Sequence, residues 1–308
     1  MSRAILAGLC VWALGSSNLL LAQVKLEQKY APNTQAATNE TFQLNAKVKV
    51  ADQNVEIAAN SRLAYLAEFP PPADNLVPIK VTVTAAALST TAAGQSYMYD
   101  SALAAPPKSD NPEFDQQVEV LQALINHPLT YQLAADGKVA RVEGAQAIIS
   151  QAPADATKAL QERLAEQRLK DEFEQQVRLL PDTPVKSGDI WQRIEQIPIQ
   201  GGTTLAIDRT YEYVGTVSQN GQQVDRIKVT DTAVRIMLGN NDIGLTLKDA
   251  DLKVASSEWT MYFNREFGAI LERAVTTRVT GKVTLLANGN DLPIDLDITF
   301  TQSRLRQK

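Results

Sequence analysis

Apolar and polar residues alternate with a period of two along most of the chain, which predicts a protein built mainly of β-strands. The clearest example is 205–229, where Asn220 and Gly221 mark a reversal, because both residues tolerate the positive φ angles of tight hairpin turns. The apolar residues of the first arm share one face of the strand, namely Leu205, Ile207, Tyr211, Tyr213 and Val217.

The second arm of this hairpin is out of phase with the first. A two-residue loop alone would set Tyr213 opposite Lys228 and turn the apolar residues of the second arm to the wrong face. We therefore predict a longer turn or a bulge between Asn220 and Arg226, which would place Tyr213 opposite Ile227 or Val229.

The same alternation predicts further strands at 24–30, 42–50, 55–68, 79–83, 190–199, 243–254, 258–263, 269–286 and 292–301. A hairpin is predicted over 129–144, with its turn at Asp136 and Gly137. For the segment rich in Ala, Ser and Thr that ends at Ala93, we expect an edge strand or a mobile loop.

Apolar residues spaced by three and four predict two helices. The first begins at Asp110 or Asn111 as the N-cap and ends near Asn126, because Pro128 disfavours helical geometry in the residue before it. The second spans 155–177, and its nearly balanced polar face favours packing against a sheet over lying on a membrane. No helix is expected beyond this segment.

These elements predict an α+β fold, in which a long, twisted, half-barrel-like antiparallel sheet packs on one or two amphipathic helices. The extended connector 180–186 is the best internal boundary, and it divides the chain into an N-terminal sheet-plus-helices half (23–180) and a C-terminal antiparallel sheet half (181–308). Similar hairpins at 131–142 and 262–274 leave open whether the two halves are related.

Residues 1–22 combine one basic residue, Arg3, with an apolar run too short to span a bilayer, which is typical of a cleaved signal peptide. We therefore expect export to the periplasm or the extracellular space. Cys10 is the single cysteine and lies in this leader, so no disulfide or cysteine nucleophile is expected in the mature chain.

The net charge of −5 gives no bulk attraction to nucleic acid. No segment after the leader is long enough to serve as a transmembrane anchor of the mature chain. The identity of a ligand and the oligomeric state stay open at this stage.

No sequence pattern of a common enzyme class is present. GxSxG, Walker, dinucleotide-binding, HExxH and CxxC patterns are all absent, and the single histidine, His127, is expected to cap a helix C-terminus. We therefore expect neither catalytic residues nor a metal or cofactor. Carboxylate pairs, Asp249 with Asp251 and Asp295 with Asp297, could serve glycoside hydrolysis or calcium binding, but a solvated strand face gives the same spacing.

Aromatic residues in the second half are the candidate ligand-binding residues. They could line the hollow of a curved sheet and hold an apolar ligand, although ordinary core packing explains them equally well. The five candidates are Tyr211, Tyr213, Trp259, Tyr262 and Phe263.

Three segments together carry a family resemblance: LPDTPVKSGDIW (180–191), the TYEYVG and NGQQVDRIKV arms of the hairpin, and LTYQLAADGKVARVEG (129–144). They resemble an uncharacterised family of secreted bacterial proteins, a domain of unknown function, over most of residues 24–304. This resemblance implies an exported bacterial protein and supplies no activity or site residues. The expected architecture also resembles that of periplasmic lipoprotein carriers, whose half-open barrels hold acyl chains, but a fold does not determine a function.

The sequence thus favours an exported, non-catalytic binding protein of the bacterial cell envelope that holds an acyl chain or an apolar peptide in a concave sheet. One alternative is a structural or assembly protein that binds a protein partner. A second alternative is an envelope hydrolase that uses carboxylates such as Asp295 and Asp297. The expected partner is accordingly an apolar ligand or an envelope protein.

Overall fold

The computed structural model describes residues 23–50, 53–103, 109–198, 203–238, 246–287 and 289–307. The helices in this part of the chain are α1 (Pro112–Leu124), α2 (Ala145–Gln151), α3 (Ala154–Arg163) and α4 (Glu166–Val177). The strands are β1 (Thr34–Val50), β2 (Gln53–Phe69), β3 (Val77–Ala92), β4 (Gln95–Asp100), β5 (Leu129–Leu133), β6 (Val139–Glu143), β7 (Ile190–Pro198), β8 (Thr203–Gln219), β9 (Gln222–Leu238), β10 (Thr246–Asn264), β11 (Ala269–Ala287) and β12 (Asn290–Arg306). The predicted signal peptide, 1–22, lies outside the described residues.

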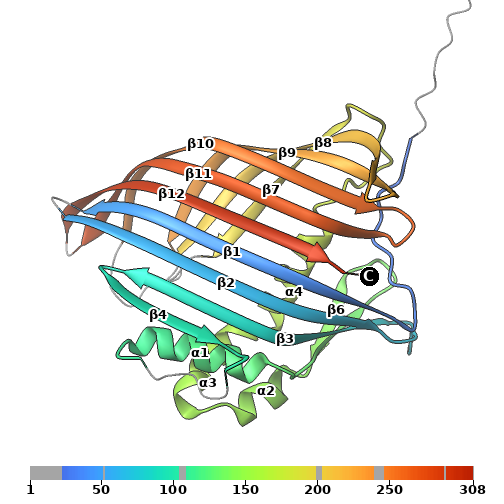
Figure 1. Cartoon of the computed structure of the whole chain (residues 1–308), viewed down its shortest axis with the longest axis horizontal. Helices are drawn as coiled ribbons and strands as arrows, with labels where there is room; N and C mark the ends of the chain where they lie inside the picture. The colour runs from blue at the N-terminus through green and yellow to red at the C-terminus, as the bar shows by residue number, and fades with distance from the viewer. Residues whose placement is uncertain are drawn as a thin grey trace, which may run out of the picture.

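All twelve strands form one open antiparallel sheet in the order β6-β5-β3-β2-β1-β12-β11-β10-β9-β8-β7, and β4 also pairs with β3. The central pair, β1 with β12, joins the beginning and the end of the described chain from Thr38–Arg306 to Val50–Ile294. Figure 1 shows that the sheet is strongly bent, with β7–β9 curving behind β10–β12 and with α4 on the inner side of the bend. The predicted long antiparallel sheet with accompanying helices is confirmed.

The strands of both predicted halves belong to this single sheet, because β1 pairs with β12. The boundary near residue 180 stays a prediction. Among the described residues no helix is both long enough and apolar enough to cross a membrane, and no helix follows α4 there, as expected.

The N-terminal segment was wrongly expected to form a strand at 24–30. Only Val24 forms a β-bridge, with Val185, through two backbone hydrogen bonds of 2.8 Å. Leu26 is buried in a cluster that includes Leu179 and Leu180. The alternation of this segment therefore reflects side chains packed against the core, namely Val24, Leu26 and Tyr30, instead of a strand ladder.

The expectation of an edge strand or loop before Ala93 was also wrong. Strand β3 pairs with β2 on one side and with β4 and β5 on the other. The small side chains of this segment hid its burial, because Ala86 packs beneath Phe114 and Val118 of α1. A helix can approach a sheet closely where alanine replaces a larger residue.

The hairpin of β8 and β9 has the predicted pairing but a different bulge. Tyr213 lies opposite Ile227, as predicted. The turn is the tight two-residue loop, with Gln219 opposite Gln222, and the extra residue is Val214 in the first arm. Gly215 accommodates this bulge with a φ of 133°, a backbone angle that residues other than glycine rarely adopt.

Helix α1 begins as predicted. The side chain of its N-cap, Asn111, accepts hydrogen bonds of 3.1 Å from the backbone N–H groups of Glu113 and Phe114. After the helix ends, the backbone N–H of His127 donates to the carbonyl of Leu124 at 3.2 Å.

The single helix predicted over 155–177 is wrong. Two helices, α3 and α4, replace it, because the backbone of Ala165 is extended (φ −54°, ψ 128°). The break lets Leu160 of α3 pack beside α1, while Phe173 of α4 stacks on Tyr131 of β5. Similarly, the two strands predicted over 243–254 and 258–263 form the single bulged strand β10, although 243–245 lie outside the described residues.

Candidate ligand-binding site

A cavity of about 300 Å³ lies between the inner face of the sheet and α4. Side chains of β1, β2, β3, β5 and β12 form its floor. Residues of α4, the segment 28–30 and the first residues of β11 complete the wall. The cavity therefore lies where the bent sheet and the helix that covers it do not touch.

Strand register explains why the floor changes from polar to apolar. One row of side chains crosses four neighbouring strands in the order Arg306, Thr38, Tyr65 and Val83. All four line the cavity, because directly paired residues of antiparallel strands point to the same face. The charged end of this row is on β12, and the apolar end is on β3.

Side-chain hydrogen bonds hold helix α4 to the sheet on both sides of the cavity. Near its start, the Nζ of Lys170 donates to the backbone carbonyl of Ala140 in β6 at 2.7 Å. Near its end, the side chain of Gln176 accepts from Arg304 of β12 at 2.6 Å. Between these contacts, Phe173 stacks on Tyr131 with 4.8 Å between the ring centroids. The helix thus spans the hollow of the sheet from β6 to β12.

The lining of the cavity is rich in cationic side chains, although the chain has a net charge of −5. The charged residues of its lining are Lys29, Arg163, Arg273, Arg304 and Arg306 against Glu40 and Glu172. Glu172 is already paired with Arg168, which does not line the cavity. Positive charge therefore exceeds negative charge along the lining.

Three phenol groups also face this cavity. Burial raises the pKa of Tyr30 to about 12, and burial followed by the charge of Glu172 raises the pKa of Tyr131 to about 12. Burial, followed by the charge of Glu40, also raises the pKa of Tyr65. All three phenols are consequently neutral hydrogen-bond donors at physiological pH.

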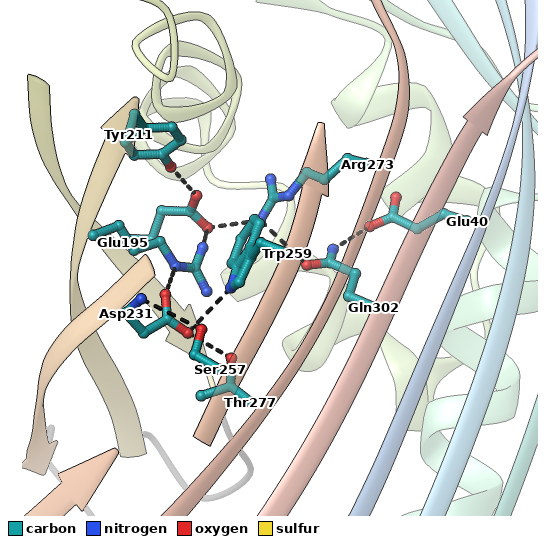
Figure 2. A network of polar contacts seen from close by, with 10 residues as sticks. Glu40, Glu195, Tyr211, Asp231, Ser257, Trp259, Arg273, Thr277 and Gln302 are labelled. Carbon is teal, nitrogen blue, oxygen red and sulfur yellow. Dashed lines mark hydrogen bonds and ion pairs between the residues drawn. The ribbon is translucent and has the colours of Figure 1, made fainter. Parts of the chain in front are cut away.

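A buried polar network supports one side of the cavity (Figure 2). Arg273, which lines the cavity, forms an ion pair of 2.8 Å with Glu195, and Glu195 also pairs with the fully buried Arg209. Arg209 donates from Nε to Asp231 at 2.9 Å. Two guanidinium groups thus alternate with two carboxylates, and the charges within the network balance.

The second carboxylate oxygen of Asp231 also accepts hydrogen bonds. Its Oδ2 accepts from Trp259 Nε1 at 3.2 Å and from the Thr277 hydroxyl at 2.5 Å. The Trp259 ring additionally lies 4.0 Å from the guanidinium carbon of Arg209, which is a cation–π contact. These contacts join β8, β9, β10 and β11 where the sheet bends.

Glu195 links the network to the pH dependence of stability. Burial alone would raise the pKa of this carboxyl, but the charges of Arg273 and Arg209 outweigh burial and lower the pKa to about 2. A carboxyl whose pKa is lower in the folded than in the unfolded state stabilises the fold above the unfolded pKa, and this stabilisation is lost as the pH falls.

We therefore expect the Glu195 contribution to be complete above about pH 4.5 and to disappear between pH 4.5 and 2. The loss is on the order of 3 kcal/mol in the free energy of unfolding. Urea unfolding at pH 7, 4.5, 3 and 2 measures it. The Glu195→Gln variant should lose less stability over this range than the native protein. The control variant Glu258→Gln, which changes an exposed residue, should lose as much stability as the native protein. Parallel pH profiles for native protein and Glu195→Gln would contradict this role.

The five aromatic residues predicted to bind a ligand lie elsewhere. Tyr211, Tyr213, Trp259 and Phe263 belong to one buried core cluster beside the network, while Tyr262 lies on the opposite face of β10 and is half-buried. None of the five lines the cavity. Tyr211 donates to Glu195 at 2.9 Å, so its hydroxyl already has a partner. Their contact with a ligand stays a prediction.

The carboxylates and the histidine that were candidate functional groups do not lie together at one site. Asp297 is held by Arg278 in a two-pronged ion pair of 2.9 and 2.7 Å, and Asp295 lies 3.8 Å from Lys282. His127 lines the cavity, and its Nδ1 is buried without a hydrogen-bond partner among the described residues. Within the same residues, no group of three or more His, Cys, Asp or Glu side chains is placed to bind a metal.

Two sets of residues in this region were missed from the sequence. Arg209 stands between Ile207 and Tyr211 in the inward phase of β8, so the alternation itself placed an arginine inside the core. Arg304 and Arg306 lie beyond the predicted end of the last strand at 301, although their spacing of two was a signal that the strand continues with both on one face.

Comparisons with known proteins identify a family over part of the chain. Residues 74–225 match the model of a family described as a family of unknown function, DUF6263. The match includes the segments 129–144 and 180–191 that suggested a domain of unknown function, and it is shorter than the 24–304 expected. No curated protein matches the sequence.

Several solved structures are similar over most of the chain, all at low identity. A structure titled "Lipid-protein interactions in lipovitellin" matches 91% of this chain at 9% identity with a TM-score of 0.45, and this chain spans about a quarter of it, 26%. Two structures from Pseudomonas aeruginosa also match. OccK5 (OpdH) has 9% identity, coverage of 89% and 98% of the two chains, and a TM-score of 0.26. OpdQ has 10% identity, coverage of 90% and 100%, and a TM-score of 0.27.

The family match relates this chain to other proteins, but the function of that family is unknown. Over residues 74–225, just under half of its length, this chain is similar to the family of unknown function DUF6263.

Proposed function

We propose that this protein is an exported, non-catalytic binding protein of the bacterial cell envelope, and that its cavity holds the apolar chain of a ligand. The observation that carries the proposal is the cavity of about 300 Å³ between α4 and the inner face of the sheet. This volume falls at the lower end of the range of about 300–1,000 Å³ for small-molecule sites.

The size of the cavity favours a ligand over a packing defect. Protein interiors have few spaces larger than a water molecule, so a space of this size is typical of a binding site. Apolar side chains from several elements face this space, among them Phe69, Ile79, Leu129 and Leu169. An apolar ligand would make dispersion contacts with these side chains and remove them from water.

An acyl chain fits better than an apolar peptide. The floor strands β1, β2, β3 and β12 all have paired neighbours on both sides, so a peptide would find few free backbone partners there. A buried peptide group without a hydrogen-bond partner costs about 1–3 kcal/mol. An acyl chain has no such groups to satisfy.

Export rests on the leader-like sequence 1–22, and an envelope protein that delivers or receives the ligand is the expected partner. Native mass spectrometry of the protein purified from the cells that produce it tests the binding role. We expect a species heavier than the chain, which returns to the mass of the chain after extraction with organic solvent. Protein that carries no lipid, and that shows no saturable binding of the apolar dye N-phenyl-1-naphthylamine after extraction, would overturn the proposal.

A further inference from the structure

We infer that the ligand is a single-chain amphiphile with an anionic headgroup, and that Arg304 and Arg306 of β12 bind this headgroup. This inference rests on the proposed function and names the class of ligand. Both arginines line the cavity, and they are two residues apart on the inner face of the strand. Leu305 between them points to the other face and is 49% exposed.

These two arginines differ from Arg209 and Arg273 of the neighbouring polar network. Arg209 and Arg273 are paired with buried carboxylates. Arg306 has only the ring of Phe69, at 5.7 Å, and forms no ion pair with any carboxylate among the described residues. Arg304 donates to the neutral amide of Gln176. Two neighbouring guanidinium groups are thus left facing the cavity without an anion.

The nearest carboxylate in the strand register does not neutralise them. Glu40 lies opposite Arg304, but among the described residues it forms no ion pair with either arginine, and its Oε1 accepts a hydrogen bond of 2.6 Å from Gln302. Burial and the charge of Arg304 both lower the pKa of Arg306, so the charged form is disfavoured where it stands. A bound carboxylate or phosphate would supply the missing negative charge, and guanidinium groups bind both anions well.

The rest of the cavity determines what is attached to this anion. From β12 the floor crosses β1, β2 and β3 to β5, which is four strand spacings or about 19 Å. Tyr131 and Phe173 stand at the far end. This length suits one long acyl chain, and the volume of about 300 Å³ leaves no space for a second chain beside it.

Displacement of bound N-phenyl-1-naphthylamine from the extracted full chain tests this inference, with three competitors that share one dodecyl chain. Dodecanoate and dodecyl phosphate carry an anionic head, and dodecan-1-ol does not. We expect at least one anionic competitor to displace the dye at about tenfold lower concentration than the alcohol, which corresponds to about 1.4 kcal/mol. The competitor that does so identifies the headgroup as carboxylate or phosphate.

The variant Arg304→Gln/Arg306→Gln should remove this preference while displacement by dodecan-1-ol stays within about twofold of native. Because Arg304 also holds Gln176, the single variant Arg306→Gln is measured as well and should lose part of the preference. The matched control is Arg278→Gln/Arg235→Gln, whose exposed arginines form ion pairs and do not line the cavity, and it should keep the native preference.

The outcomes separate the two proposals. If all three competitors displace the dye equally, or if the preference survives in both Arg306 variants, the headgroup inference is wrong and the apolar cavity site still stands. If the dye and all three competitors fail to bind the extracted native protein, the proposed function itself fails.

Discussion

Replacing Arg209 by methionine is expected to lower the free energy of unfolding by about 3–5 kcal/mol at pH 7. The guanidinium group is fully buried between Asp231 and Glu195, and the side chain of Asp231 is fully buried as well. Methionine fills similar space without a charge, so Asp231 keeps its neutral donors but loses its counter-ion. Leaving a buried carboxylate without its counter-ion is among the most destabilising changes in a protein core.

Urea unfolding measures this loss against the control variant Arg235→Met. Arg235 forms a two-pronged ion pair with Asp208 at the surface of the same hairpin, so its loss should cost about 1 kcal/mol or less. The double variant Arg209→Met/Asp231→Leu should recover part of the stability, since it removes both charges. Equal losses for Arg209→Met and Arg235→Met would show that the network does not stabilise the bend of the sheet.

The second large effect is expected on binding. Replacing Ala67 by phenylalanine should weaken the binding of dodecanoate by about tenfold or more. Ala67 lines the cavity between Ala36 and Val81 in the strand register, and a benzyl group there would occupy space that the ligand needs. Calorimetric titration of the extracted protein measures the change in affinity.

The variant Ala64→Phe is the matched control for this experiment. Ala64 lies on the same strand and points to the opposite face, outside the cavity lining. It should bind dodecanoate like the native protein, and both variants should keep the native circular dichroism spectrum. Native affinity in a folded Ala67→Phe variant would place the ligand outside this cavity.

Most strands could be predicted from the sequence because a half-buried strand imposes its own period. The alternation of β8 and β9 even predicted that Tyr213 lies opposite Ile227 or Val229, and Ile227 is its partner. Which arm carries the bulge could not be predicted, because either arm can restore the phase. The segment before Ala93 was misjudged for a related reason, since alanine and threonine show too little contrast in hydrophobicity to reveal a paired strand.

The cavity depends on contacts that no local pattern encodes. It exists because α4 leaves the axis of α3 at Ala165 and crosses the bent sheet, and neither the break nor the crossing has a clear local signal. The aromatic residues chosen from the sequence are inward-facing apart from Tyr262, yet these four pack in a separate core cluster, where Trp259 contacts Arg209, instead of lining the cavity. An arginine in the inward phase of a strand was the more informative signal, both at Arg209 and at Arg306.

The most direct test of the cavity as a binding site is a crystal structure of the extracted protein grown with 12-bromododecanoate, in which anomalous scattering locates the bromine atom. We expect one bromine site beside the stacked rings of Tyr131 and Phe173 at the apolar end of the cavity, with the carboxylate near Arg306. A cavity without ligand in protein that binds the compound in solution, or bromine bound only elsewhere on the molecule, would contradict it.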